Sequence, residues 1–287
     1  MIDLHMHSTA SDGQFSPAEL INTASQKGLS VLALTDHDTI NGLEEGKKAA
    51  EQNGIIFVPG IEITIEQPFC EFHLLGLGIE KPSKSLYELI EKVQLNRRNR
   101  NLEILKHINS IGFSVTIDEI QSDFPNQNLG RPHFAAWMEK NGIVKSKQEA
   151  FDKYLARGRP WFCEHEGANL DEAIVAIYES AALPVLAHPM SLYLSWGKLD
   201  SAFKDFKERG IAGIEAFHPG ARVTECLRLE DLARKYNFFV TAGSDFHGPK
   251  IRRDRKPGHT CGDKKIEDRF YYEELLPALE KSRTESF

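Results

Sequence analysis

Cysteine is scarce in this sequence of 287 residues, and its four copies lie far apart, at Cys70, Cys163, Cys226 and Cys261. No two of them form a Cys-x-x-Cys pair, which excludes the ligand spacing of zinc fingers. The disulfide frameworks of small secreted domains are also excluded, because they need a much denser set of cysteines. We therefore expect reduced thiols and a cytoplasmic protein.

Positive charge and long apolar segments are also lacking. The formal net charge is −7, so no overall basic field exists that could attract duplex DNA, and an anionic substrate must be held by local charge or by metal ions. No apolar run approaches the length of a membrane span, and Asp3 and His5 stand where a signal peptide would be basic and apolar. We expect a monomer that binds neither duplex DNA nor membranes.

Short apolar runs alternate with helical patterns over most of the chain. Runs that are apolar on both faces are typical of parallel strands covered by helices on both sides of a sheet. The clearest runs are 31–34, 55–58, 185–187 and 238–240, and weaker ones are 73–77 and 213–217. With the opening strand they make about seven βα units, which favours an α/β fold of the (β/α) barrel type. An open doubly wound sheet is the structural alternative.

Helix signals lie between these runs. Ser16-Pro17-Ala18-Glu19 is a capping box with proline at the first helical position. Further helices are predicted at 43–52, 171–181 and 222–236.

Residues 97–166 interrupt the alternation of strands and helices. No strong strand separates the helical patterns in this stretch, which lie at 102–111, 132–140 and 147–157. We interpret 97–166 as a small helical insertion domain in a barrel formed by 1–96 and 167–287, although long crossover helices would give the same pattern. Arg97, Arg98 and Arg100 are expected to form a solvated helix face.

Histidine and acidic residues gather at the predicted strand ends. His5 and His7 are two positions apart in a strand, so their imidazoles project on one face, and Asp12 can return from the next loop with a carboxylate. Such ligands suit zinc, manganese or iron. The full set of candidate metal ligands is His5, His7, Asp12, His37, Glu62, His73, His188, Asp245 and His247. Because nine groups exceed the coordination of one ion, we predict two or three ions that share a bridging carboxylate.

The motifs that carry these residues resemble, in their order along the chain, those of the polymerase and histidinol phosphatase (PHP) family. They are His5-Met6-His7, Thr35-Asp36-His37-Asp38, Gly60-Ile61-Glu62, His188-Pro189 and Gly243-Ser244-Asp245-Phe246-His247. Within the insertion, segments 130–135 and 154–158 resemble the branch that contains nucleoside 3′,5′-bisphosphate phosphatases and a 5′→3′ exoribonuclease. The resemblance implies an incomplete, seven-stranded barrel that binds three divalent ions, Mn²⁺, Fe²⁺ or Zn²⁺.

The same resemblance implies how the ligands are shared. The first ion would take His5, His7, Glu62 and Asp245, the second Glu62, His73 and His188, and the third Asp12, His37 and His247. Paired ions lower the pKa of a shared water, and the resulting metal-bridging hydroxide would attack phosphorus. Glu62 and Asp245 would serve catalysis by holding the ions, and His218 is a candidate donor of the proton that the leaving oxygen needs.

Substrate contacts are predicted from the basic residues. Arg131 and His133 are the best candidates in the insertion, because a guanidinium matches phosphate in bidentate geometry; a purely structural pair is the alternative. Arg252 and Arg253 belong to a basic run at 250–256, which is either a phosphate-attracting loop or a solvated one. The nucleotide-active branch commonly has Arg-Tyr after His-Pro, whereas this chain has Met190-Ser191-Leu192-Tyr193. The basic run or Arg222 could replace the missing arginine.

The predicted function is therefore that of a metal-dependent phosphoesterase. Its expected substrates are phosphorylated nucleotides or short single-stranded RNA ends. Two alternatives stay open, a small-molecule phosphatase of the histidinol-phosphate type and a nucleotide-binding regulatory module that keeps its metal without turnover. Asp36 and Asp38 flank His37 and are expected either to orient the ligands or to cap the strand end.

Overall fold

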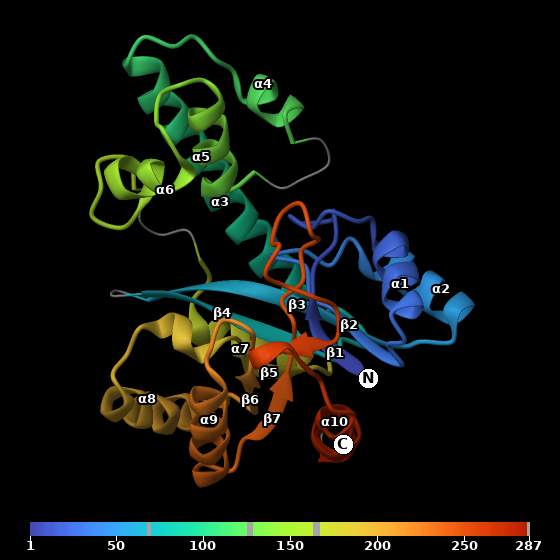
Figure 1. Ribbon diagram of the computed structural model, residues 1–287. Helices are drawn as coiled ribbons and strands as arrows, with labels where there is room; N and C mark the ends of the chain where they lie inside the picture. Colours follow the sequence, from blue (N-terminus) through green and yellow to red (C-terminus); the bar gives the residue numbers. More distant parts are fainter. Residues whose placement is uncertain (68–69, 125–128, 163–166, 286–287) are drawn as a thin grey trace. The chain divides into compact units, whose positions relative to one another are not determined.

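The main sheet has seven strands, which are hydrogen-bonded in chain order. The computed structural model describes residues 1–67, 70–124, 129–162 and 167–285 (Figure 1). The strands are β1 (Ile2–Met6), β2 (Val31–Leu34), β3 (Ile56–Gln67), β4 (Cys70–Leu77), β5 (Leu183–Leu186), β6 (Gly213–Phe217) and β7 (Phe239–Ala242), followed by a small pair, β8 (His259–Thr260) and β9 (Lys264–Lys265). Each predicted apolar run coincides with or overlaps one of the first seven strands.

The sheet is only partly parallel, so the prediction of parallel βα units throughout is wrong. β4 runs antiparallel to β3 and β5, and the other neighbouring pairs are parallel. Two residues separate Gln67 from Cys70, whereas a crossover between parallel strands needs a dozen or more. The chain therefore reverses direction directly from β3 to β4, and one helical crossover is missing.

The first and last strands approach each other without a regular ladder in the described part of the chain. Two backbone hydrogen bonds connect them, from the His7 N–H to the Phe246 carbonyl (3.0 Å) and from the Asp245 N–H to the His5 carbonyl (2.9 Å). The buried Asp3 carboxylate on β1 also accepts two backbone N–H groups from the segments after β7. The sheet is thus the incomplete seven-stranded barrel that was predicted.

Helices cover the sheet. α1 (Pro17–Gln26) begins at the predicted capping box, in which Ser16 and Glu19 each accept the other's backbone N–H. α1 packs on α2 (Leu43–Asn53), α7 (Leu170–Glu179) packs on β5, and α9 (Val223–Lys235) packs on β6 and lies beside α8 (Trp196–Arg209) (Figure 1). The other elements of this part are η2 (Pro189–Leu192), η3 (Cys261–Asp263), η4 (Phe270–Leu275) and α10 (Leu276–Glu285). None of the described helices combines the length and apolarity needed to cross a membrane.

The chain divides into two compact units, Met1–Ile90 with Ala168–Phe287, and Glu91–Gly167. The second unit is helical and has its own apolar core, which includes Ile104, Phe134 and Trp137. Its helices are the distal part of α3 (Lys84–Ser110), α4 (Ile117–Ser122), α5 (Arg131–Lys140), α6 (Lys147–Ala150) and the π-helix η1 (Phe151–Leu155). The predicted functional domains, 1–96 with 167–287 and 97–166, stay a prediction.

Arg100 departs from the predicted solvated helix face, although Arg98 is exposed as expected. Arg100 is only 5% exposed, and its guanidinium donates to the Asn101 side chain (2.8 Å) and to the Leu129 carbonyl (3.4 Å). Asn101 donates to the same carbonyl (3.0 Å). The two side chains therefore fix the backbone just before α5, which explains why a charged residue is buried here.

Candidate metal centre

The nine predicted metal-binding side chains come together at one end of the first unit. Loops that follow parallel strands meet at the same edge of a barrel, and the β3–β4 hairpin adds two groups from within its strands. The sources are β1 and its following loop for His5, His7 and Asp12, the loop after β2 for His37, β3 for Glu62, β4 for His73, the loop after β5 for His188, and the loop after β7 for Asp245 and His247.

Glu62 is the centre of this cluster. Its carboxylate is completely buried and lies within 3.2 Å of five imidazoles. Oε2 faces His5 Nε2 (3.2 Å), His7 Nε2 (3.2 Å) and His37 Nδ1 (3.1 Å), and Oε1 faces His73 Nδ1 (2.9 Å) and His188 Nε2 (2.9 Å). Because the two oxygens face different sets of imidazoles, this carboxylate has the geometry to bridge two ions.

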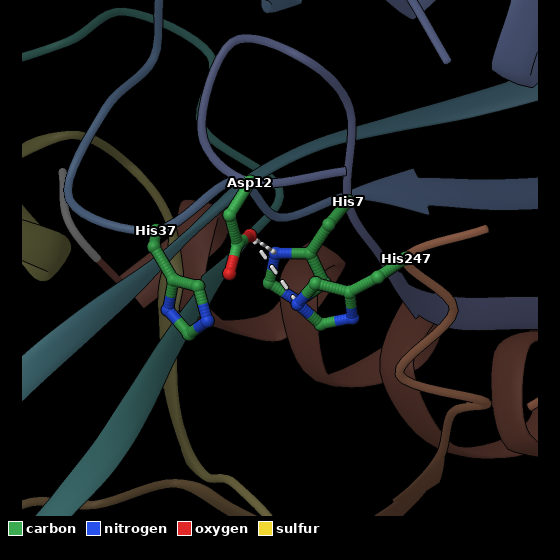
Figure 2. Close-up of side chains that lie close together, drawn as sticks. All are labelled: His7, Asp12, His37 and His247. Carbon is green, nitrogen blue, oxygen red and sulfur yellow. Dashed lines mark ion pairs between the residues drawn. The ribbon is translucent and has the colours of Figure 1, made fainter. Parts of the chain in front are cut away.

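A second group surrounds Asp12, as Figure 2 shows. Asp12 Oδ1 lies 3.3 Å from His247 Nε2 and 3.9 Å from His7 Nδ1. The ligand-type atoms of these residues and of His37 all lie within 4.8 Å of one another. The predicted third site contained Asp12, His37 and His247, and the structure adds His7 to this group.

Asp245 links the cluster to His218. Its Oδ1 lies 3.4 Å from His7 Nε2 and 3.8 Å from His5 Nε2, and its Oδ2 lies 3.3 Å from His218 Nε2. His218 Nδ1 accepts the N–H of Gly220 (3.0 Å), so a neutral His218 carries its proton on Nε2. The structure therefore points the protonated nitrogen of His218 at the edge of the cluster.

Several buried atoms of the cluster make no hydrogen bond within the described residues. They are His5 Nε2, His7 Nδ1 and Nε2, His37 Nδ1 and Glu62 Oε2. Burying polar atoms without partners is unfavourable by about 1–3 kcal/mol each, and every one of these atoms is a potential metal ligand. The donor set of imidazoles and carboxylates therefore fits divalent metal ions.

The pKa values in the cluster follow from burial and close charges. Burial alone would raise the pKa of Glu62, but the surrounding imidazoles, with His37 the strongest, hold it well below its usual range. Burial would lower the pKa of His7, but the close carboxylates of Asp245 and Glu62 raise it to about 10. Burial lowers the pKa of His37 to about 3. Because a metal ligand must be a neutral imidazole, ion binding is expected to displace a proton from His7.

Glu215 on β6 is a functional residue that the sequence reasoning missed. It is buried, and its Oε1 accepts a hydrogen bond from His5 Nδ1 (2.9 Å), which leaves His5 Nε2 to face Glu62. Its Oε2 accepts the backbone N–H of His188 (2.8 Å). Carboxylates of this kind fix the tautomer and orientation of metal-binding histidines. The available signal was an acidic residue inside the apolar run 213–217.

Asp36 and Asp38 orient the loops of the site. Asp36 accepts the N–H and the hydroxyl of Ser8 (2.7 and 2.6 Å) and the hydroxyl of Ser11 (2.6 Å), so it holds the loop after β1. Asp38 accepts the N–H and the hydroxyl of Thr64 (2.8 and 3.0 Å) on β3. Both carboxylates thus hold segments next to the candidate ligands, and the choice between the two predicted roles stays a prediction.

Three residues of the site have a left-handed backbone, Asp38 (φ 51°), His188 (φ 28°) and Asp245 (φ 53°). This conformation is unfavourable by about 1–3 kcal/mol for residues other than glycine, and it concentrates at functional sites. The N–H groups of all three are held, by the Glu62 carbonyl for Asp38, by Glu215 for His188 and by the His5 carbonyl for Asp245.

The predicted substrate contacts have different surroundings. Arg252 Nη1 donates to Asp245 Oδ2 (3.1 Å), so this side chain reaches the metal centre. Arg253 and Arg222 are exposed, the latter just before α9. The other two candidates lie in the second unit. Arg131 begins α5 with its guanidinium 5.3 Å from the ring centre of Phe162, and His133 Nδ1 accepts the N–H of Gly130 (2.8 Å).

Comparison with known proteins adds a family and several relatives. The PHP domain family matches residues 3–154. A 3′,5′-nucleoside bisphosphate phosphatase of Chromobacterium violaceum is 31% identical over 260 residues, covering 90% of this chain and 91% of the relative. A 5′-3′ exoribonuclease of Haemophilus influenzae is 32% identical over 247 residues, covering 86% and 90%. A phosphoribosyl 1,2-cyclic phosphate 1,2-diphosphodiesterase of Eggerthella lenta is 30% identical over 253 residues, covering 86% and 94%.

Two solved structures resemble this chain over nearly its whole length. An amidohydrolase of Chromobacterium violaceum, solved with bound sulfate and no metal, superposes with a TM-score of 0.83 and 29% identity over 98% of this chain and 96% of its own. A candidate metal-dependent phosphoesterase of Bifidobacterium adolescentis gives a TM-score of 0.78 and 25% identity, covering 96% of each chain. The similarity therefore extends over both compact units of the chain.

Proposed function

This chain belongs to the PHP domain family and is a metal-dependent phosphoesterase, and we propose that it hydrolyses phosphate esters of nucleotides or of short single-stranded RNA. Two relatives that support the proposal, named as a nucleoside bisphosphate phosphatase and an exoribonuclease, match nearly the whole chain. The main structural support for the proposal is the buried Glu62 carboxylate among five imidazoles, because such a group is suited to holding adjacent cations.

The proposed cofactor is a set of three divalent ions, Mn²⁺, Fe²⁺ or Zn²⁺. Their ligands would be His5, His7, Asp12, His37, Glu62, His73, His188, Asp245 and His247. When bound, such ions supply an activated water and neutralise charge on a phosphate. Glu62 would hold two of them together, and Glu215 would keep His5 and His188 in their orientations.

His218 is proposed as the residue that gives a proton to the leaving oxygen. Its Nδ1 is occupied by the Gly220 N–H, and its Nε2, which carries the proton, faces Asp245 at the edge of the cluster. Asp245 would both hold a metal ion and orient this imidazole. A positioned general acid of this kind typically contributes a factor of about 10²–10⁴ to the rate.

We propose that basic side chains bind the parts of the substrate that the metal ions do not hold. Arg252 is the proposed phosphate contact beside Asp245. Arg131 and His133 in the helical insertion, 97–166, and the exposed Arg222 and Arg253 are proposed to contact the remainder of the substrate. Phosphate contacts from arginine are strong because they are charge-assisted and bidentate.

A substrate panel tests this function. The metal-loaded protein should release phosphate from adenosine 3′,5′-bisphosphate, or mononucleotides from a 5′-phosphorylated dinucleotide, faster than phosphate from histidinol phosphate. A cyclic phosphodiester of phosphoribose belongs in the panel as well, because the Eggerthella lenta relative bears that activity in its name. Preference for histidinol phosphate would replace the nucleotide assignment. Tight nucleotide binding without turnover would instead indicate a regulatory module.

A further inference from the structure

Arg255 is a buried cation next to the metal centre. Only 5% of its side chain is exposed, and its Nε has no hydrogen-bond partner among the described residues. Asp254, whose side chain is 63% exposed, is the one described carboxylate within 4.0 Å of its guanidinium, and the distance from Asp254 Oδ2 to Nη1 is 3.4 Å. Buried charges are normally paired with buried counter-ions, and no buried carboxylate of the described residues lies within 4.0 Å of the Arg255 guanidinium.

The surroundings place this guanidinium near His218 and near Arg252. Arg255 Nη2 and His218 Nδ1 both lie close to Gly220, since a side-chain carbon added there would be 3.4 Å from the first and 2.8 Å from the second. Arg252, from the same loop, contacts both Asp245 (3.1 Å) and Asp254 (3.6 Å).

The local charge balance favours an anion. Two guanidinium groups share the exposed Asp254. Burial lowers the pKa of Arg255, and the nearby charge of Arg252 lowers it further, whereas Asp245, Asp254 and Glu215 raise it. Asp245 and Glu215 are already engaged by histidines of the cluster. An additional anion would relieve the repulsion between the two arginines.

We propose that Arg255 and Arg252 form a clamp for the phosphate group of the substrate, and that this phosphate is the counter-ion of Arg255. The clamp rests on the proposed function, because it holds the phosphate next to Asp245 and His218, where the leaving oxygen would receive its proton. Arg252 supplies a partly exposed guanidinium beside Asp245, and Arg255 supplies a second, buried one. The ligand class is a phosphate monoester dianion, and inorganic phosphate as the product has the same chemistry.

The test compares Arg255→Met with wild type and with the control Lys256→Met. Lys256 is an exposed cation of the same loop whose ammonium pairs with Asp263 (2.7 Å), so its removal changes the net charge equally. The dissociation constant of inorganic phosphate is measured by titration calorimetry on the Mn²⁺-loaded proteins, and Tm is measured with and without phosphate. Arg255→Met should weaken phosphate binding by about ten- to a hundred-fold, the range expected for a charge-assisted contact. Lys256→Met should change it by less than about twofold, as expected for an exposed charge.

The Tm values separate a binding role from a structural one. Replacing a buried charge without a buried partner by an apolar side chain of similar length is neutral or stabilising, so Arg255→Met should keep or raise the phosphate-free Tm. A lowered Tm with an unchanged phosphate constant would make Arg255 a structural residue and overturn the clamp. If Arg255→Met does not fold, Arg255→Lys replaces it in the test, since this variant keeps the charge and loses the planar guanidinium. Unchanged phosphate binding by Arg255→Lys would refute the clamp, and weakened binding would support it.

The clamp and the proposed function can fail separately. Wild-type protein that binds phosphate through Arg255 but hydrolyses no phosphoester would refute the function and leave the clamp standing. Hydrolysis by Arg255→Met with an unaltered phosphate constant would refute the clamp and leave the function standing.

Discussion

Replacing Glu62 by glutamine exchanges one oxygen of the central carboxylate for an NH₂ group and removes the negative charge. The carboxylate lies within 3.2 Å of imidazoles from His5, His7, His37, His73 and His188. An amide offers one acceptor oxygen where the carboxylate offers two. The Glu62→Gln protein therefore keeps the shape of the side chain and loses the capacity to bridge two cations.

The expected effect on the rate is large. A neutral amide cannot hold adjacent ions at the separation that activates a water, so we expect kcat/KM to fall at least 10³-fold, or about 4 kcal/mol in the barrier. Stability should also fall. The surrounding imidazoles hold the pKa of Glu62 well below its usual range despite burial, so its charge also stabilises the metal-free fold at neutral pH, and this contribution is lost in the variant. The metal-free variant should still fold, with a Tm below that of metal-free wild type.

The assay measures kcat/KM on adenosine 3′,5′-bisphosphate, metal content by elemental analysis, and Tm without metal. Glu44→Gln is the matched control, because it makes the same chemical change in the exposed first turn of α2. Glu62→Gln should lose activity and bound metal together, and Glu44→Gln should lose neither. Activity of Glu62→Gln within tenfold of wild type would show that Glu62 is not the bridge, and the reasoning from its five contacts would then be wrong.

Three further predictions concern the number of metal ions, Arg131 and Glu215. Elemental analysis and anomalous scattering should find three divalent ions per chain, and a single ion under metal-replete conditions, with Asp12, His37 and His247 unligated, would contradict the ligand assignment. Arg131→Ala should lower kcat/KM for a nucleotide bisphosphate or a 5′-phosphorylated dinucleotide by about ten- to a hundred-fold, and should affect p-nitrophenyl phosphate less; equal losses would reduce Arg131 to a general or structural role. Glu215→Gln should weaken metal affinity by about 10–100-fold, measured by competition with a chelator, and an unchanged affinity would remove Glu215 from the metal centre.

Much of the fold could be predicted because local patterns determine it. The apolar runs became the strands, and the capping box at Ser16 begins α1 as expected. The direction of β4 was predicted wrongly, because periodicity identifies a strand without giving its orientation. β3 continues to Gln67 and β4 begins at Cys70, beyond the predicted runs 55–58 and 73–77, so the spacing of the runs did not exclude a helical crossover.

The candidate site, too, could be predicted only in part from the sequence. Histidines and carboxylates at strand ends could be predicted to meet, because parallel strands end at one edge. The contacts of Glu215 with His5 and His188 depend on how β1, β5 and β6 pack, and sequence spacing does not contain that information. Arg100 was assigned to solvent for a similar reason, since its partner carbonyl on Leu129 is distant in the sequence.

The central claim is that this chain is a phosphoesterase whose chemistry depends on ions held around Glu62. It is tested most directly by the rate of phosphate release from adenosine 3′,5′-bisphosphate, measured on one preparation before chelation, after chelation and after Mn²⁺ is restored. The rate should vanish with the metal and return with it. No release from the metal-loaded protein, or release that chelation leaves unchanged, would contradict the account.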